Sequence, residues 1–293
     1  MNLRVNSTLT TAEKTLIDQF GKSRDNLPGH GEPWMNEVRA RAIQSFEKSG
    51  LPHRRLERWK YTDLRSMLGQ MPAPVSGTQA PELPDQEGVN AHTVFSSVER
   101  HSGVFVNGTF RPELSNLAGI EGVEVVNLRE GFDSLPDWVK ARLGNTKVFE
   151  DNAVVALNTA FAADGVALRI KAGAEIKKPI HLDYVVTGNE AATICLRNLI
   201  VVEKGAQATI VETYTGPHDS AYVVNAATEI TVEDEARFTR IRVQDEGHNA
   251  FHLANMQILA GENTRCHDLT LSLGAKVSRN EVNVGFSGEN ADV

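Results

Sequence analysis

Three consecutive residues, Cys266, His267 and Asp268, have side chains that can bind a transition metal. They lie in a stretch of alternating apolar and polar residues, which predicts a β-strand. Successive side chains of a strand point to opposite faces, so three neighbours cannot converge on one ion. We therefore predict a structural histidine on the apolar face, in the core or at an edge, and an exposed thiol on the polar face. The apolar face is assigned from the leucines that share the parity of His267: Leu269, Leu271 and Leu273.

Two other histidines, His248 and His252, are four residues apart, a spacing that serves a metal on a helix. Here they flank a predicted turn at 247–250, so the spacing gives little support for a metal site. Paired carboxylates would suit glycosidic cleavage. The candidate acids lie in predicted turns, where we expect solvated side chains: Glu203, Glu233, Asp234 and Glu235.

The two cysteines, Cys195 and Cys266, are far apart in the sequence. They form neither a CxxC pair nor a disulfide framework, which is typical of a protein in a reducing cytosol. Cys195 has the parity of Thr193 and Arg197, and we expect it to be a structural or surface cysteine. The sequence also encodes no P-loop, because the position of the required first glycine is occupied by Leu16.

The segment Glu57–Tyr61 places two aromatic residues among charges. One hypothesis is a platform on which a nucleic-acid base stacks. The other is a buried Trp59 with a hydrogen-bonded Tyr61, which together hold helices against strands. The acidic net charge of the chain favours this second hypothesis.

The composition is that of a globular protein, with 41% apolar and 23% charged residues in a chain of 293. It excludes wholesale disorder and collagen-like structure. The 30 basic and 38 acidic residues give a net charge of −8, which disfavours nucleic acid or an anionic membrane as a partner. We find no apolar signal segment at the N-terminus and no run long enough to span a membrane, so we expect a cytoplasmic protein.

Helical patterns are concentrated in the first seventy residues. Thr10 and Thr11 are suited to cap a helix over 12–20 that Gly21 ends, and Pro33 suits the first turn of a helix over 34–48. A third helical piece is predicted within 56–68, and shorter helices at 135–143 and 152–163. The proline-rich stretch at 71–91, which follows the first three helices, predicts a linker or surface loop.

Short alternating strands dominate the rest of the chain. The pair Asn107-Gly108 predicts a hairpin with a type I′ turn, and nine further strands are predicted between 166 and 286. Similar turns recur at intervals of roughly thirty residues, which is typical of a solenoid whose stacked coils share one core. A β-sandwich would also give many short strands and stays open as the alternative. The recurring turns lie at 171–174, 203–206, 233–236, 261–264 and 288–291.

Several segments together resemble the SufD branch of the SufB/SufD family, which belongs to the SUF system of iron–sulfur cluster assembly. The N-terminal signature consists of Pro33-Trp34, Arg39, Ala42, Phe46, Gly50–Pro52, Arg55, Glu57, Trp59–Thr62 and Leu64. Later matches are Phe105–Gly108, Leu157–Phe161, Asp164-Gly165 and Lys178–Leu182. The block Trp59–Thr62 is the part that separates SufD from its paralogue SufB.

The resemblance implies a mainly β protein with an N-terminal helical domain, a right-handed parallel β-helix core and a small C-terminal helical domain. We accordingly predict a helical domain at 1–70, a linker at 71–91, a mixed strand and helix transition at 92–149 and a β-helix core at 150–293. The resemblance also implies a non-catalytic scaffold subunit that pairs with SufB and docks the ATPase SufC. Its task would be to support iron delivery and cluster assembly.

The family uses a cysteine and a histidine for cluster formation, and both lie beyond the part that this sequence matches. We therefore expect no catalytic, cofactor-binding or metal-ligating residue in this chain, and iron or a cluster only in the context of the full complex. Family members continue past the stretch that matches 283–293, so we predict a core that is incomplete at the C-terminus and a chain that does not capture SufC alone.

Three points stay open from the sequence. A homodimer is one of them. The other two are different function classes, namely a carbohydrate-active β-helix lyase or hydrolase and a purely structural β-solenoid.

Overall fold

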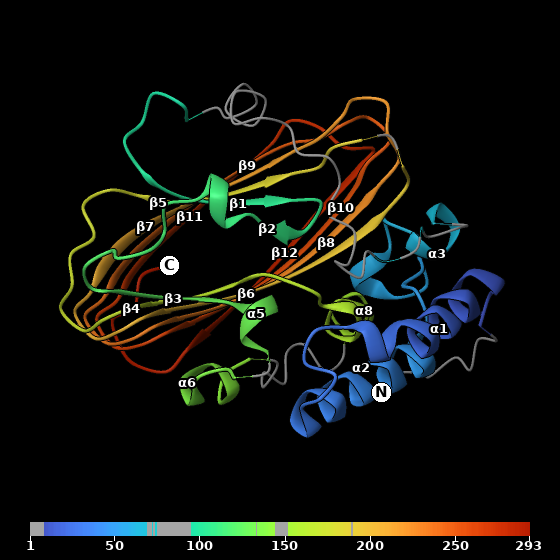
Figure 1. Ribbon diagram of the computed structural model, residues 1–293, viewed down its shortest axis with the longest axis horizontal. Helices are drawn as coiled ribbons and strands as arrows, with labels where there is room; N and C mark the ends of the chain where they lie inside the picture. The colour runs from blue at the N-terminus through green and yellow to red at the C-terminus, as the bar shows by residue number, and fades with distance from the viewer. Residues whose placement is uncertain are drawn as a thin grey trace.

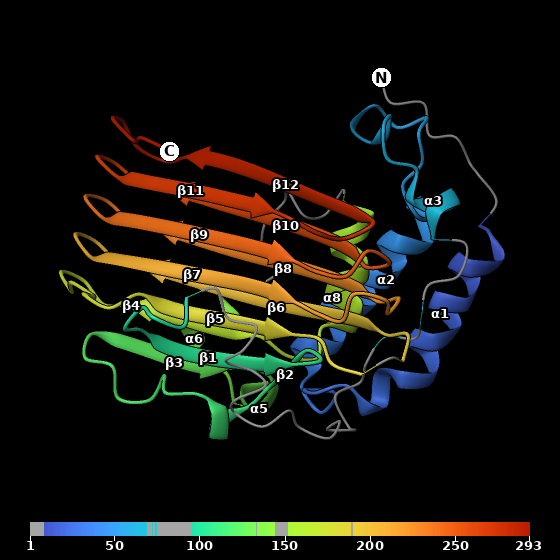
Figure 2. The same cartoon turned by 90° about the horizontal axis from the view of Figure 1, so that it is seen from above.

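Two stacked β-sheets and a layer of helices make up the computed structural model, which describes residues 9–68, 72, 74, 95–132, 134–143, 152–188 and 190–293. In Figure 1 the strands follow a flattened coil, and the helices lie to one side of it. Figure 2 shows the successive coils side by side from β3 to β12. The predicted mainly β solenoid is confirmed.

Each sheet contains six strands, and consecutive strands of the solenoid alternate between the two sheets. The first sheet, called sheet A, is ordered β12 (Val277–Phe286), β10 (Phe251–Ala260), β8 (Val223–Val232), β6 (Thr193–Val202), β4 (Val166–Ile170) and β3 (Val123–Asn127). The second, sheet B, is ordered β11 (Arg265–Ser272), β9 (Arg237–Asp245), β7 (Gln207–Thr215), β5 (Ile180–Val185), β1 (His101–Val106) and β2 (Thr109–Phe110).

The pairing between coils is parallel. Along sheet A, Thr193 pairs with Val223, Val223 with Phe251, and Phe251 with Val277, so each coil is slightly shorter than the one before. Only the β1–β2 hairpin and the β3–β4 pair are antiparallel among the ladders of the described chain. A β-sandwich would be built from antiparallel ladders, so the register excludes that alternative.

The recurring turns lie at the corners where a sheet A strand passes to a sheet B strand. Their last residues stack on one another, and Ala206, Ala236 and Thr264 are completely buried. A small side chain is needed at each of these places because the chain reverses there around the shared core. This stacking explains the spacing of the turns in the sequence.

The longer helices precede the solenoid or enter it. The α-helices are α1 (Thr11–Ser23), α2 (Pro33–Ser49), α3 (Leu64–Met67), α5 (Leu128–Gly131), α6 (Asp137–Lys140) and α8 (Ala153–Phe161), with 3₁₀ turns η1 (Arg24–Asn26), η2 (Glu57–Trp59) and η3 (Pro112–Leu114). Thr10 and Glu13 form a capping box at the start of α1, as the sequence suggests. The helix does not end at Gly21 as predicted but continues to Ser23, because a glycine weakens a helix without ending it.

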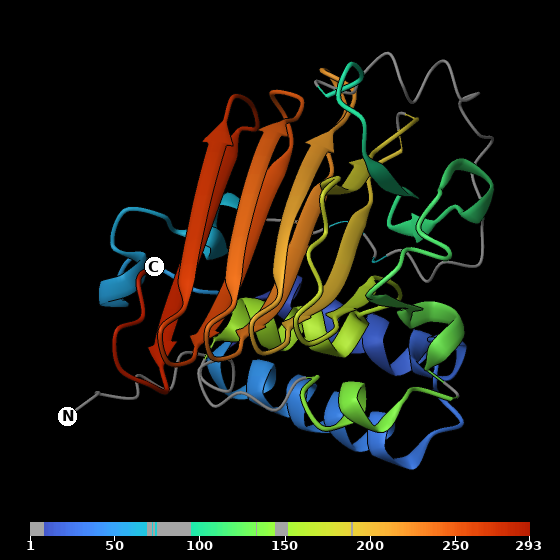
Figure 3. The ribbon, with the colours of Figure 1, turned by 90° about the vertical axis from the view of Figure 1, so that its left-hand side faces the viewer.

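The helices cover the outer face of sheet A. Helix α8 lies on β6 and β8, and α2 packs on the other side of α8, as Figure 3 shows. Helix α8 is apolar nearly all round because it is enclosed between two layers. Among the described residues, no helix combines the length and the apolar character that crossing a bilayer requires.

The hairpin at Asn107 and Gly108 has positive φ at both residues, which confirms the type I′ prediction. The helix predicted at 135–143 is shorter, since only Asp137–Lys140 is α-helical. Apart from Pro72 and Pro74, the predicted linker at 71–91 lies outside the described residues.

Candidate functional site

A charged network lies inside the solenoid and joins three successive coils of sheet B. Arg240 of β9 binds Glu212 of β7 through two hydrogen bonds, Nε to Oε1 at 2.8 Å and Nη2 to Oε2 at 2.7 Å. Its Nη1 donates to Oδ1 of Asp268 on β11 at 2.8 Å. The phenol of Tyr214 donates to the same Glu212 carboxylate at 3.2 Å. The single guanidinium therefore connects β7, β9 and β11 from within.

Burial and ion pairing act in opposite directions on this network. Burial alone would raise the pKa of Glu212, but the adjacent Arg240 outweighs it and the net pKa is lowered. Burial would likewise lower the pKa of Arg240, and the two carboxylates raise it above its usual range. Both partners are thus held in their charged forms.

The predicted faces of β11 are reversed in the structure. Cys266 points inward into the apolar core, whereas Leu269, Leu271 and Leu273 are 61%, 47% and 58% exposed on the outer face of sheet B. His267 is exposed with these leucines. The prediction was wrong because the inner positions of this coil after Cys266 are polar, so apolar character did not mark the inside.

Both thiols are buried. Burial raises the pKa of Cys195 to about 12 and, with a smaller contribution from Asp268, that of Cys266 to about 11. Cys195 lies between sheet A and the helices, packed with Val223 and Phe251. Of the two predicted roles, structural or surface, it has the structural one.

These thiols should be unreactive in the folded protein. At pH 8 we expect both to react with Ellman's reagent at least about 100-fold more slowly than a free cysteine, because the thiolate fraction is small. Both should react rapidly in denaturant. One equivalent of fast-reacting thiol in the native protein would contradict the burial of either side chain.

The two histidines four residues apart do not share a site. His252 is completely buried and its Nδ1 lies 2.6 Å from Oε2 of Glu246. His248 is exposed in the turn and faces His218 of the preceding coil, with 5.8 Å between the ring centroids. Within the described residues, no group of three or more His, Cys, Asp or Glu side chains is placed to hold a metal ion.

The acids in the turns, which we predicted only to be solvated, form contacts that hold the structure together. Glu203 binds Arg169 and accepts the backbone N–H of Ala172 at 2.9 Å from the preceding coil. Asp234 similarly accepts the N–H of Glu262 at 2.8 Å from the following coil. These carboxylates therefore fix one corner of the solenoid to the next.

Polar contacts also fasten the helices to sheet A. Asn158 of α8 donates to two carbonyls of neighbouring strands, Leu196 at 2.9 Å and Asn225 at 2.7 Å. Arg197 of β6 pairs with Glu229 of β8 and reaches Thr159 of α8 at 3.2 Å. Sequence reasoning missed the role of Asn158, although Asn158 and Thr159 are the two polar residues in the otherwise apolar run 153–163, which is a usable signal.

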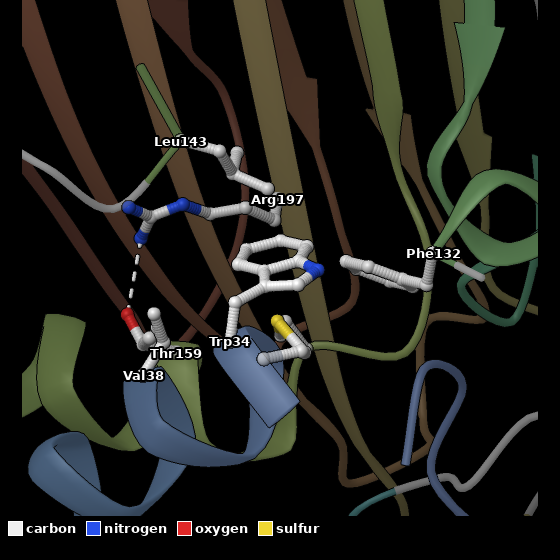
Figure 4. A pocket seen from close by; sticks show the side chains of 8 residues that line it. Trp34, Val38, Phe132, Leu143, Thr159 and Arg197 are labelled. Carbon is white, nitrogen blue, oxygen red and sulfur yellow. Dashed lines mark hydrogen bonds between the residues drawn. The ribbon is translucent and has the colours of Figure 1, made fainter. Parts of the chain in front are cut away.

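A small pocket lies beside this contact, between α2, α8 and the 132–143 segment. Figure 4 shows the Trp34 indole directed toward Arg197 and the Phe132 ring, with Val38, Leu143 and Thr159 completing most of the wall. Arg39 donates to the carbonyl of Ala162, one of the lining residues, at 2.8 Å. The pocket walls come from the helices and from β6, so it marks the junction of the two parts of the chain.

The aromatic block at 57–61 provides a second junction. Trp59 is buried, and the Arg279 guanidinium of β12 lies 3.8 Å from its ring centroid. The predicted anchoring role of Trp59 is confirmed. Tyr61 is 89% exposed, so its predicted role as a hydrogen-bonded partner in the anchor is wrong.

We expect Arg279→Gln to lower the free energy of unfolding by about 1 kcal/mol, because it removes the cation over the Trp59 ring. Tyr61→Ala should change it by no more than about 0.5 kcal/mol, as expected for a surface side chain. Urea unfolding of both variants checks the pair. A larger loss from Tyr61→Ala than from Arg279→Gln would contradict this assignment of the anchor.

These features define a parallel β-solenoid of two sheets, with a helical region fastened to one sheet by polar and aromatic contacts. The SufBD protein N-terminal region matches residues 10–182, and the SufBD core domain of the SUF system for FeS cluster assembly matches residues 184–293. The chain belongs to the SufBD family.

Two relatives illustrate the match. An iron-sulfur cluster assembly SufBD family protein of Synechocystis sp. is 32% identical over 248 residues, covering 79% of this chain and 52% of the relative. The iron-sulfur cluster assembly protein SufD of Escherichia coli is 26% identical over 252 residues, covering 85% of this chain and 55% of the relative. The chain therefore spans about half the length of either relative.

Proposed function

We propose that this chain acts in iron–sulfur cluster assembly as a non-catalytic scaffold subunit of a SUF complex with SufB and SufC. The observation that supports this most is the match of both the N-terminal and the core regions of the SufBD family along almost the whole chain. The similarity to a protein named SufD favours the SufD branch. We place this activity in the cytoplasm.

The contacts of the titratable side chains support a scaffold role. Glu212 and Asp268 are bound by Arg240, and Glu203 by Arg169. These groups hold coils together and are engaged in the folded chain. Such a role calls for a rigid body with defined surfaces, which a solenoid of stacked parallel coils provides.

Complementation tests the role in assembly. We expect a chimera in which this chain replaces the matching part of E. coli SufD to restore the activity of an iron–sulfur enzyme such as aconitase, under iron limitation, in an E. coli strain that lacks SufD. E. coli SufD is the positive control and Tyr61→Ala a matched variant with an unaltered core. Absence of rescue by a soluble, folded chimera would contradict the proposed role.

Co-purification tests the partners separately. The chain would carry an affinity tag and be expressed with SufB and SufC from the same source organism. We expect SufB to be retained with the tagged chain, as the proposed pairing requires. Retention of SufC without SufB would show that the docking surface for the ATPase lies within residues 1–293.

Anaerobic reconstitution with iron and sulfide tests whether the isolated chain binds an iron–sulfur cluster. We expect no stoichiometric cluster absorbance, because the two cysteines lie in separate environments and are both buried. A cluster that forms in the wild-type chain and is lost in Cys266→Ser would overturn this expectation.

A further inference from the structure

A second arginine lies inside the solenoid beside the first. Arg242 follows Arg240 by two residues on β9, so both side chains point inward, and Arg242 is only 1% exposed. Among the described residues it forms no ion pair, and its Nε and Nη2 have no hydrogen-bond partner. Both neighbouring carboxylates, Glu212 and Asp268, are already bound to Arg240. A buried guanidinium in this condition needs another partner, because burying an unpaired charge is costly.

Further unpartnered polar groups gather around Arg242. Gln244 is completely buried two residues along β9, and neither its amide oxygen nor its amide nitrogen has a partner. The parallel ladder places Thr270 directly beside Arg242, and the buried Thr270 hydroxyl is also unpartnered. Arg242 and Gln244 are alternate residues of β9, and Thr270 is the ladder partner of Arg242 on β11, so these groups face one region of the interior.

Sheet A contributes to the same region from the opposite side. The His252 ring lies 4.7 Å from the Tyr214 ring, and Tyr214 is the ladder neighbour of Gln244. Nε2 of His252 has no hydrogen-bond partner. The coils before this one carry Ile194 and Val224 at the position of His252, so at this position of sheet A the interior changes from apolar to polar at β10.

The geometry points to a binding site for a small inorganic anion inside the solenoid, held by Arg242 with Gln244, Thr270 and His252 around it. A guanidinium, an amide and a hydroxyl all donate hydrogen bonds to an anion, and the charge of the anion would compensate that of Arg242. Bound there, the anion would link β9 to β11 on one side and face β10 on the other. Water alone is the competing occupant.

Thermal unfolding at constant ionic strength tests the site with bromide as the probe. We expect the midpoint of the full chain to rise by about 2–4 °C when sodium gluconate is replaced by sodium bromide at ten times the dissociation constant. Arg242→Gln should abolish this rise. Arg237→Gln is the matched control, because Arg237 is an exposed cation at the start of the same strand and the rise should persist.

Crystals of the unaltered protein soaked in sodium bromide give an independent readout that does not depend on the folding of a variant. We expect an anomalous peak within hydrogen-bond distance of the Arg242 guanidinium. Density for water alone at Arg242, or a bromide effect on the midpoint that is equal in Arg242→Gln and wild type, would overturn the proposal.

Discussion

Arg240→Met is expected to lower the free energy of unfolding by about 3–5 kcal/mol. The substitution removes three charge-assisted hydrogen bonds and leaves Glu212, which is completely buried, without its counter-ion. Because the guanidinium joins β7, β9 and β11, the loss should also weaken the pairing of adjacent coils. Urea unfolding measures the change in free energy, and hydrogen exchange of the three strands shows where it acts.

Two further variants distinguish the effect of leaving a buried charge unpaired from the effect of losing any arginine. Arg169→Gln removes two ion pairs at the solenoid surface, with Glu203 and Glu124, where all three side chains are partly exposed, and should cost less than about 1 kcal/mol. The double variant Arg240→Met with Glu212→Gln should recover part of the loss, because no carboxylate is then buried alone. An equal loss in Arg169→Gln and Arg240→Met would contradict the argument.

The same network predicts the pH dependence of stability. The folded-state pKa of Glu212 lies below its ordinary value of 4.5, so the folded state binds fewer protons than the unfolded state near that pH. The stabilisation is present above pH 4.5 and is lost as the pH falls through the folded pKa. Arg240→Met should flatten this part of the curve.

The order and type of the elements could be predicted because local patterns determine them. Strand β4, Val166–Ile170, begins where the first of the nine strands between 166 and 286 was predicted, and the Asn107-Gly108 turn has the conformation that its residue types require. The recurring turns indicated the solenoid because each ends in a small residue, and the stacked corners bury three of these, Ala206, Ala236 and Thr264. Family resemblance and periodicity agreed on this architecture.

Which face of a strand lies inside could not be predicted from periodicity alone. Alternation separates two faces, and on β11 the apolar one, with Leu269 and Leu271, lies outside. A better signal was present on β9, where Phe238 has the parity of Arg240 and Arg242. Because the three side chains share one face, either the phenylalanine had to be exposed or the two arginines had to be buried. Only the stacking of coils shows that the phenylalanine side, with its arginines, is the interior. The candidate site was missed for this reason.

The motif Asp164-Gly165 illustrates how residues that attract attention in the sequence can be explained by packing. The Asp164 carboxylate accepts the backbone N–H groups of Phe110 at 2.8 Å and Gly165 at 2.7 Å. Burial raises its pKa to about 6 against these hydrogen bonds. The Asp164 carbonyl accepts the N–H of Arg197 at 3.1 Å, so the motif joins the hairpin to β6 just before β4 begins.

Gly165→Ala adds a single methyl group at this junction and should destabilise the fold severely. A Cβ at position 165 would lie 1.7 Å from the backbone oxygen of Arg197, and the backbone has φ of +152°, which side chains rarely adopt. Neither neighbour can yield, because the Gly165 carbonyl accepts Leu128 N–H at 3.0 Å and Arg197 N–H is bound to Asp164. We expect a loss of more than about 4 kcal/mol, seen as insoluble or unfolded protein.

The matched control is Gly173→Ala, in the turn that follows β4. Gly173 also has positive φ, at +69°, but nothing lies within 4 Å of its added Cβ. Only the conformational cost of about 1–2 kcal/mol should appear, and the protein should remain folded. Circular dichroism and urea unfolding of the two variants then distinguish close backbone approach from backbone conformation. If Gly165→Ala folds with a stability equal to that of Gly173→Ala, the contact between position 165 and β6 does not hold the first coil in place.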